Sequence, residues 1–407
     1  MMSMQKDVHD LQSLFPAEFD EASLQNHKPQ KPYHNDVLGF LDAWSKLLLA
    51  NPLSRAYPDV ITFAFWIRKG NLKKYEENFI SRNSDNSRLG RGIVFHIAPS
   101  NVPINFAYSL VVGLLAGNAN VVKVPSREFP QIDLICSSLD KLCNDRQWEA
   151  FKASIKLVRY ERSNRKWTDF FSSIADVRII WGGDNTIEDV KRSKIPPRSF
   201  DIAFADRYSF CVLNADKLVV EPKIDDLARG FYNDTHLFDQ NACTAPHLVV
   251  WLGTKVNIQL AKQKFWVALE SIIDIEYNLE PIVAVDKLTA FCREAIHEEG
   301  IVREPAKSNG IIRIQLDKLP ADVTKLRGFG GYFNEYDTKD LNEIAPIVTR
   351  KFQTLSYYGV DKDELLSFVV DNSLVGIDRI VPIGKTLDFD VMWDGWDLIT
   401  SLSRIIG

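Results

Sequence analysis

Runs of β-branched and aromatic residues alternate with helix-like segments along most of the chain, and this alternation restricts the fold more than any other feature. Residues 92–99 (GIVFHIAP) and 118–125 (NANVVKVP) have the composition of strands, and the apolar residues 106–117 between them are typical of a buried helix. A strand, a helix and a second strand in this order form the unit that builds parallel sheets. We therefore predict an α/β fold.

Further strand-like segments repeat this pattern in both halves of the chain. They are residues 154–160, 176–183, 210–215, 247–253 and 310–316. Most are continuous hydrophobic runs, as expected for strands of a sheet that helices cover on both faces. Residues 1–35 are polar instead and predict a loosely held N-terminal arm. The order of the motifs places a domain boundary near residue 213.

Composition and charge restrict the partners and the compartment. The 407 residues carry 49 Lys and Arg against 54 Asp and Glu, a net charge of −5, which argues against nucleic acid or an anionic membrane as a general partner. The longest apolar stretch, residues 106–117, is about half of the ~20 residues that a membrane span needs. The N-terminus lacks the features of a signal peptide, and five cysteines without a C-x-x-C motif predict a reducing cytoplasm.

One of the five cysteines, Cys243, differs from the others in its surroundings. Its neighbours from Asp239 to Thr244 are polar or small, which fits an accessible loop better than a core. A cysteine near a helix end gains thiolate character and becomes a strong nucleophile, so Cys243 is the candidate nucleophile. The other four lie in apolar helical or strand patterns typical of structural thiols: Cys136, Cys143, Cys211 and Cys292.

Histidines on both sides of Cys243 raise the alternative of a metal site or a Cys-His pair. His236 and His247 supply with Cys243 only three ligands, whereas a structural zinc site takes four, so we expect no metal. His247 begins a strand-like run and His96 lies inside one. Both are therefore expected to be structural residues.

Two glycine-rich segments are further candidates for ligand binding. Residues 181–185 (WGGDN) and 328–333 (GFGGYF) match neither the G-x-G-x-x-G nor the P-loop pattern. The first follows a predicted strand and precedes a predicted helix. Gly182 and Gly183 could bring backbone N–H groups to a phosphate there, or form only a tight turn.

The order of the motifs resembles that of the aldehyde dehydrogenase superfamily. Residues 97–103 (IAPSNVP) and 114–126 (LLAGNANVVKVPS) are similar to its P-x-N-x-P, A-L-x-x-G-N and K-P-S motifs. Residues 179–184 stand at its F-T-G-S turn, and residues 241–246 (NACTAP) at its G-Q-x-C segment. Three C-terminal segments, RKFQTLSYYGV, GIDRIVPIG and WDGWDLITSLSRII, look specifically like the LuxC-like acyl-CoA reductase branch, which reduces fatty acyl thioesters to aldehydes.

The resemblance implies an aldehyde-dehydrogenase-like architecture. Residues 1–213 would form the N-terminal arm and a Rossmann-type dinucleotide-binding domain, and residues 214–380 a smaller α/β catalytic domain. Residues 381–407 would pack back on the body of the protein. Cys243 is expected in the cleft between the two domains.

The resemblance also assigns roles to single residues. Cys243 would attack the acyl carbonyl, expel the CoA thiol and hold the acyl group as a thioester, and Asn101 would stabilise the oxyanion. The positions implied in cofactor binding are Pro99, Ser100, Lys123, Ser126, Arg127, Gly182 and Gly183.

Cofactor choice depends on the residues that follow the K-P-S motif. Ser126 and Arg127 stand where dehydrogenases that choose NAD often carry a glutamate, and they would accommodate a 2′-phosphate. We therefore predict NADPH. An alignment shift of one residue would put Glu128 in this place and favour NADH instead.

The chain departs from the superfamily at the E-L-G-G-K motif, whose glutamate activates water in the oxidising members. Residues 203–210 (AFADRYSF) stand there, with Phe204 near the glutamate position. Without a general base for water, an acyl-enzyme is spared from hydrolysis, which suits a reductase and argues against an ordinary aldehyde dehydrogenase. A second acidic residue that usually positions the nicotinamide ribose has no evident counterpart.

The expected function is therefore the NAD(P)H-dependent reduction of an acyl-CoA, in particular a fatty acyl-CoA, to the aldehyde. The alternatives are an aldehyde dehydrogenase, either CoA-acylating or hydrolytic, and a catalytically silent scaffold in an acyl-transfer complex. Because Cys243, Asn101 and Lys123 are all present, the scaffold is disfavoured. The resemblance further implies a homo-oligomer and an acyl-activating or acyl-protein synthetase partner.

Overall fold

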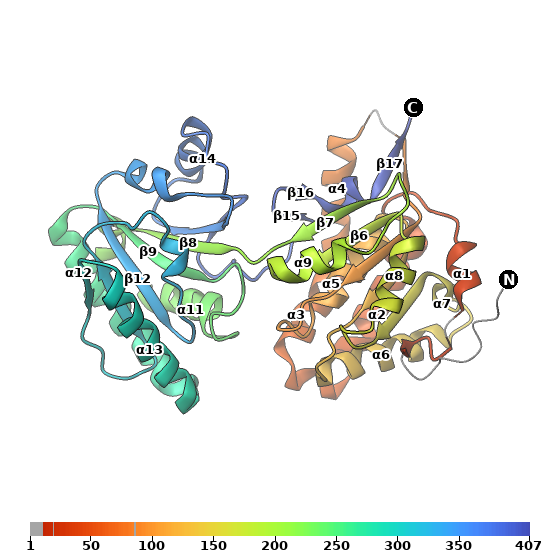
Figure 1. The fold of residues 1–407 in the computed structure, drawn as a ribbon, viewed down its shortest axis with the longest axis horizontal. Helices are drawn as coiled ribbons and strands as arrows, with labels where there is room; N and C mark the ends of the chain where they lie inside the picture. The colour runs from red at the N-terminus through yellow and green to blue at the C-terminus, as the bar shows by residue number, and fades with distance from the viewer. Residues whose placement is uncertain (1–10, 19, 85–86) are drawn as a thin grey trace. The chain divides into compact units, whose positions relative to one another are not determined.

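The computed structural model describes residues 11–18, 20–84 and 87–407 (Figure 1). The chain forms two compact units. The first contains the chain up to Ala205 together with Val391–Gly407, and the second is Asp206–Asp390. The prediction from sequence had placed the change of domain at residue 213 and the start of the C-terminal segment at residue 381.

A six-stranded sheet forms the centre of the first unit. Its spatial order is β1 (Gln12–Phe15), β5 (Ile155–Arg159), β4 (Ala119–Lys123), β3 (Ile93–Ile97), β6 (Val177–Trp181) and β7 (Phe200–Phe204). All neighbours are parallel except β1, which is antiparallel to β5. The chain passes from β3 outward to β5 and then returns to β6 on the other side of β3. This reversal is the switch point of a doubly wound α/β sheet.

Helices on the two faces of this sheet explain its hydrophobic strands. They are α2 (Asn35–Ala50), α3 (Pro58–Trp66), α4 (Lys69–Arg82), α5 (Asn105–Leu115), α6 (Pro130–Cys143), α7 (Phe151–Ser154), α8 (Arg165–Ile174) and α9 (Asp184–Lys191). Helix α5 is buried from Phe106 to Leu115 and connects β3 to β4, so the predicted strand-helix-strand unit is confirmed. The α/β class predicted from the alternation is confirmed as well.

The prediction of a loosely held arm over residues 1–35 is wrong for the part that the structure describes, because that part packs into the first unit. Strand β1 pairs with β5, and α1 (Glu21–Gln25) buries Leu24 in the core of the unit. The polar composition hid this because a short edge strand needs few buried side chains. Residues 1–10, on which the rest of the arm and most of the signal-peptide argument fall, lie outside the described residues.

The C-terminal residues complete the first unit. Strand β17 (Ser403–Ile406) pairs with β2 (Ser87–Gly90), and it follows α15 (Leu398–Ser401) and the small β15–β16 ladder, Met392–Trp393 with Trp396–Asp397. The buried Arg88 fastens this end, because its guanidinium donates to Ser403 Oγ at 2.9 Å and to the Thr400 carbonyl at 2.6 Å.

A seven-stranded sheet forms the centre of the second unit. Its order is β10 (Ile301–Arg303), β11 (Ile312–Leu316), β12 (Tyr332–Thr338), β9 (Pro246–Leu252), β8 (Tyr208–Asn214), β13 (Phe352–Tyr358) and β14 (Arg379–Pro382), and only β10 is antiparallel to its neighbour. Its helices are α10 (Ala215–Val219), α11 (Ile224–Thr235), α12 (Lys255–Glu276), α13 (Pro281–His297) and α14 (Lys362–Asp371). Alternate residues of β8 pack into two hydrophobic cores. Phe210 and Val212 lie in the core on one face of the sheet, and Cys211 and Leu213 in the core on the other.

No helix in the described part of either unit has the length and apolar character needed to cross a membrane.

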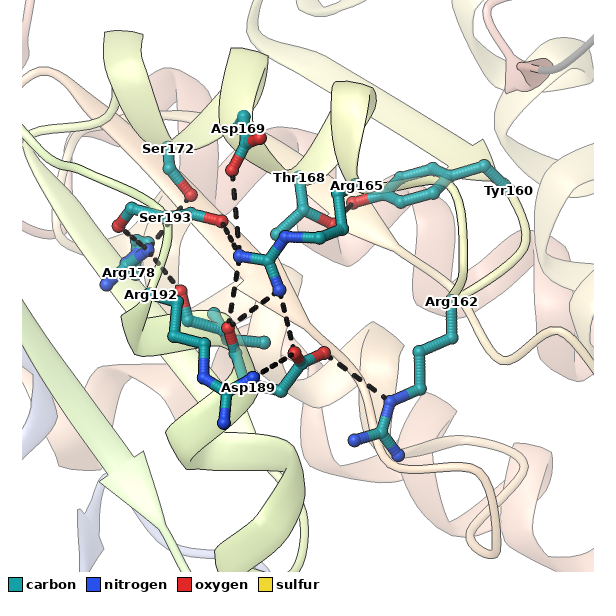
Figure 2. A network of polar contacts seen from close by, with 11 residues as sticks. Tyr160, Arg162, Arg165, Thr168, Asp169, Ser172, Arg178, Asp189, Arg192 and Ser193 are labelled. Carbon is teal, nitrogen blue, oxygen red and sulfur yellow. Dashed lines mark hydrogen bonds and ion pairs between the residues drawn. The ribbon is translucent and has the colours of Figure 1, made fainter.

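A buried arginine near the amino ends of β6 and β7 joins the first sheet to α8 and to the end of α9 (Figure 2). Arg178 on β6 is 2% exposed at its side chain and forms a two-pronged ion pair with Asp201 on β7, at 2.7 and 2.8 Å. Its remaining donors reach Ser172 Oγ on α8 and the carbonyls of Val190 and Ser193 at the end of α9. Every branch of the guanidinium is thus bonded.

We predict that Asp201→Asn lowers the free energy of unfolding by about 3–5 kcal/mol, because it leaves a buried guanidinium without its counter-charge. Urea unfolding measures the change. Asp169→Asn is the matched control, since its exposed carboxylate lies 3.9 Å from Arg165 in the same region and should contribute less than about 1 kcal/mol. Equal effects of the two variants would contradict a structural role for the buried pair.

Candidate active site

Cys243 lies in a tight turn between α11 and β9. The Ala245 N–H donates to the Ala242 carbonyl at 2.9 Å, so Cys243 occupies the first central position of the turn and is partly exposed. The expectation of a loop setting for this cysteine is confirmed.

The other cysteines differ from Cys243. Burial raises the pKa values of the Cys136 and Cys143 thiols to about 12 and also raises that of Cys211, which suits inert structural thiols. The prediction is wrong for Cys292, which is exposed on α13. The helical spacing of its neighbours predicts a core position, but α13 buries Lys287 and Glu294 and exposes the side that carries Cys292.

A buried glutamine fixes the backbone in front of Cys243. Asp239 and Gln240 both have positive φ values, 50° and 60°, which non-glycine residues adopt only at a cost of ~1–3 kcal/mol each. The Gln240 amide compensates because its Nε2 donates to the carbonyls of Pro246 and Tyr332, at 2.9 and 3.0 Å. Its Oε1 accepts from the N–H groups of Gly331 and Tyr332, at 3.1 and 2.9 Å.

These four hydrogen bonds correct one part of the sequence interpretation. The polar character of Gln240 predicts an accessible neighbour of Cys243, yet this residue is fully buried. Its amide connects the cysteine loop to the first residues of β12. The sequence gives no signal for this role, because the partner Tyr332 lies 92 residues away.

Two more contacts hold the same loop. Ser209 Oγ on β8 donates to the Cys243 carbonyl at 2.7 Å and accepts from the Thr354 N–H of β13 at 3.2 Å. On the other side, the Tyr277 hydroxyl donates to Asp239 Oδ1 at 2.7 Å. The Cys243 carbonyl is therefore tied to β8, and the start of its loop to the end of α12.

The second glycine-rich segment belongs to this support. Gly331 has a φ of 85°, and a Cβ there would collide with the Gly310 carbonyl and lie 2.8 Å from His236 Nε2. Only glycine can therefore bring this backbone next to Gln240. Residues 328–333 lead into β12 and serve the cysteine loop.

The two histidines near Cys243 are buried. Desolvation lowers the pKa of His236 to about 3 and places that of His247 well below its usual value, so both imidazoles stay neutral at pH 7. His247 is the extra residue of a β-bulge, where Ser209 and Phe210 pair with Pro246 and Leu248. Both of its ring nitrogens are buried, and the backbone of Gly328 lies within reach of the ring.

His96 is a satisfied core residue, as expected. Its ring nitrogens lie 2.7 Å from Ser109 Oγ and 3.0 Å from Asn120 Oδ1, and burial lowers its pKa to about 4. In the described ranges, no three His, Cys, Asp or Glu side chains gather where they could hold a metal ion.

The first unit places two groups of predicted residues at the switch point of its sheet. Strands β3 and β6 are direct neighbours, and Pro99, Ser100 and Asn101 follow the carboxyl end of β3. Gly182 and Gly183 follow the carboxyl end of β6. Ligands of doubly wound sheets bind at this position. The topology thus brings together segments about 80 residues apart in sequence.

The third predicted group follows β4, the next strand along. The Lys123 ammonium lies 5.0 Å from the Tyr160 ring centre, and Ser126 Oγ lies 3.5 Å from the Tyr160 carbonyl. Partial burial lowers the pKa of Lys123. Ser126 and Arg127 are exposed, and the Arg127 guanidinium lies 5.1 Å from the Phe129 ring centre.

Helix α9 begins directly after the glycines with an N-terminus that no described side chain caps. Unpaired N–H groups at a helix start favour a phosphate. Arg162 and Arg165 lie nearby on the β5–α8 side, where both contact Asp189 of α9 (Figure 2). The sequence interpretation had not singled out these arginines or Tyr160.

Phe204, at the predicted position of the missing general base, ends β7 with a buried ring. It stacks on Trp181 with ring centres 3.9 Å apart. An apolar ring in this setting can neither accept nor donate a proton.

The fold is that of the aldehyde dehydrogenases. A benzaldehyde dehydrogenase of Corynebacterium glutamicum has a TM-score of 0.59 and 16% identity, with 94% of this chain and 86% of that chain covered. A 1-pyrroline-5-carboxylate dehydrogenase from Thermus, solved with bound NAD, has a TM-score of 0.60 and 12% identity, with coverages of 91% and 80%. At these identities the likeness establishes the fold alone.

A family model described as "Acyl-CoA reductase (LuxC)" matches residues 17–279, more than half of the chain. The chain therefore belongs to the LuxC family of acyl-CoA reductases. Long-chain acyl-protein thioester reductases of Aliivibrio fischeri and Photorhabdus laumondii are 24% and 22% identical to it over 74% of the chain. The matched region spans about 60% of the length of each relative.

We predict that Gln240→Ala slows the alkylation of Cys243 by iodoacetamide at least tenfold and lowers the free energy of unfolding by about 2–4 kcal/mol, because four backbone groups lose their partners. The parent protein, Gln240→Ala and the control should all carry Cys292→Ser, so that only Cys243 remains as an accessible thiol among the described cysteines. Asn241→Ala, which changes the exposed neighbour, is the control. An alkylation rate equal to that of the control would contradict a role for Gln240 in positioning Cys243.

Proposed function

We propose that the chain is an NAD(P)H-dependent acyl thioester reductase that forms an acyl-enzyme on Cys243 and releases an aldehyde. The observation that carries this proposal is the partly exposed Cys243 thiol, held in a tied turn by Gln240 and Ser209, in a chain of the LuxC family. A thiol that only fills a core needs no such support. The other described cysteines lack it.

The residues at the carboxyl edge of the first sheet fit a dinucleotide. The uncapped start of α9 after Gly182 and Gly183 suits a pyrophosphate, and Lys123 beside Tyr160 suits a ribose. Exposed Ser126 and Arg127 suit a 2′-phosphate, which favours NADPH. NADH is the alternative. The reduced nicotinamide, when bound, supplies the hydride that converts the acyl group to the aldehyde.

The chain's own residues perform the remaining steps. The Cys243 thiolate adds to the acyl carbonyl, the bond from the carbonyl carbon to the donor sulfur breaks, and the donor leaves as a thiol after taking up a proton. Asn101 is proposed to donate its side-chain amide to the oxyanion. After reduction, the bond to Cys243 Sγ breaks, and the aldehyde and a regenerated thiolate result.

Phe204, at the position of the missing general base, favours reduction of the acyl-enzyme over its hydrolysis to a free acid. A hydrolytic dehydrogenase needs a base that activates water, and Phe204 packs on Trp181 as a hydrophobic side chain. The acyl-enzyme therefore persists until it is reduced. The CoA-acylating oxidation of an aldehyde is the same chemistry in reverse and stays an alternative, whereas a scaffold would have no use for the cysteine turn.

We propose a long-chain acyl-CoA as the acyl donor. The names of the relatives favour an acyl-protein thioester as the second candidate, with an acyl-activating synthetase as the partner. Both donors present the same carbonyl to Cys243. They differ in the leaving thiol, so parallel assays with each donor distinguish them.

We predict that wild-type protein incubated with a long-chain acyl-CoA and no cofactor gains one acyl adduct by intact-protein mass spectrometry, and that Cys243→Ala gains none. Addition of NADPH should discharge the adduct as aldehyde, because the thioester is the reducible species. An adduct of equal yield on Cys243→Ala would remove this residue from the mechanism.

Asn101→Ala is the companion variant for this experiment. Loss of one oxyanion donor should slow acylation ~100- to 1,000-fold while the final adduct stays on Cys243. Cys292→Ser is the control for nonspecific acylation, since Cys292 is also exposed but sits on α13 without a comparable turn.

We predict that Arg127→Ala raises the KM for NADPH about tenfold or more and leaves the KM for NADH within about twofold, because a charged hydrogen bond contributes ~1.5–3 kcal/mol. Initial rates with the two cofactors measure the ratio. Glu128→Ala is the control and should leave the preference for NADPH unchanged. A larger change in the NADPH-to-NADH preference in Glu128→Ala than in Arg127→Ala would assign cofactor choice to Glu128.

A further inference from the structure

Helix α13 has an inverted amphipathic arrangement. The residues that it buries most deeply include a lysine and a glutamate, Lys287 and Glu294. The buried Lys287 ammonium donates to the carbonyls of Asn309 and Gly330, and the Glu294 carboxylate accepts from the Tyr332 hydroxyl. The helix is thus attached to its unit in large part by polar contacts.

The opposite side of the same helix is apolar and exposed. Ile282 and Val285 are each 59% exposed, Leu288 is 48% and Ile296 is 77% exposed. Exposed apolar side chains scattered singly are ordinary, but a continuous row on one helix marks an interaction surface. Figure 1 shows α13 along the outside of the second unit.

The spacing of this row is that of a helix-packing seam. Its members are Ile282, Val285, Leu288, Thr289, Cys292 and Ile296, all exposed and none charged, and we call them the α13 stripe. Alternating steps of three and four residues connect Ile282, Val285, Thr289, Cys292 and Ile296, as at the a and d positions of a heptad, and Leu288 flanks this seam. The stripe is about 21 Å long at 1.5 Å per residue.

The charges beside the stripe are self-complementary. Asp286 and Arg293 are seven residues apart and therefore occupy the same flanking position in successive heptads. When two copies of α13 pack antiparallel with residue 289 opposite residue 292 of the partner, each Asp286 faces the Arg293 of the other helix. Both side chains are exposed.

We propose that the α13 stripe is an interface for a second copy of this chain, with the two α13 helices packed antiparallel across a two-fold axis. A two-fold interface must complement itself, and the Asp286–Arg293 pattern does so only in the antiparallel register. A single helix pair buries less area than a standard interface, so the dissociation constant is expected on the order of 10 μM. The inference is independent of the catalytic proposal.

Charge reversal tests the partner's identity. By sedimentation velocity, Asp286→Arg and Arg293→Asp should each weaken the dimer about tenfold or more, since two attractive pairs become repulsive. The double variant, Asp286→Arg with Arg293→Asp, should restore the wild-type dissociation constant within about threefold. A different protein on this surface would not allow that restoration, so a double variant as weak as the single ones overturns the proposal.

Two outcomes of the same measurement decide the remaining cases. A wild-type protein that is monomeric at 100 μM, tenfold above the expected ~10 μM constant, overturns the proposal. So does a dimer that Val285→Glu leaves intact. Circular dichroism and the acyl-adduct assay verify that each variant is folded, because none of these residues belongs to the proposed catalytic or cofactor sites.

Cysteine cross-linking tests the antiparallel register. In a Cys292→Ser background, the double variant Val285→Cys with Ile296→Cys should form a disulfide-linked dimer, while either single variant should not. The two positions are eleven residues, about 16 Å, apart on one helix, too far for a disulfide within it. Cross-linking of the single variants would indicate parallel helices and overturn the proposed arrangement.

Discussion

The Gln240 amide is the interaction on which the cysteine region depends. Its four hydrogen bonds join the loop before Cys243 to the start of β9 and of β12, and they hold two residues in a left-handed backbone conformation. A primary amide suits this place because it offers two donors and an acceptor with two lone pairs in one plane. A carboxylate would face two carbonyl oxygens, and an apolar side chain would leave four buried backbone groups unpaired.

The polar strands of the second sheet follow the same principle of paired buried groups. Glu335 on β12 is fully buried, yet its carboxylate accepts from Arg313 Nε at 2.6 Å and from Trp251 Nε1 at 2.8 Å. Such groups are stable inside a protein only when their partners are in place. The sheet that carries Cys243 is therefore specified by polar pairing as well as by hydrophobic packing, which favours one register over its neighbours.

The sequence predicts the parts of the fold in which hydrophobicity alone decides. Residues 154–160 and 176–183 could be assigned as strands because fully covered parallel strands are continuous apolar runs, and β5 and β6 lie there. Strands β12 and β13 carry buried polar residues such as Glu335 and Thr354. These two strands are therefore not continuous apolar runs, and hydrophobicity alone did not predict them. For the site, small polar neighbours indicated the exposed turn of Cys243. The buried role of Gln240 depends on long-range contacts that a local pattern does not contain.

The pairing of β17 with β2 has a consequence for the order of synthesis. Arg88 and its partner Ser403 are 315 residues apart, so the first unit lacks β15, β16 and β17 until the whole second unit has been translated. A ribosome that adds roughly 5–20 residues per second leaves this edge unpaired for tens of seconds. The second unit, Asp206–Asp390, is contiguous and can close during that time. The second unit is synthesised later than most of the first, yet it can complete its fold before the first unit does.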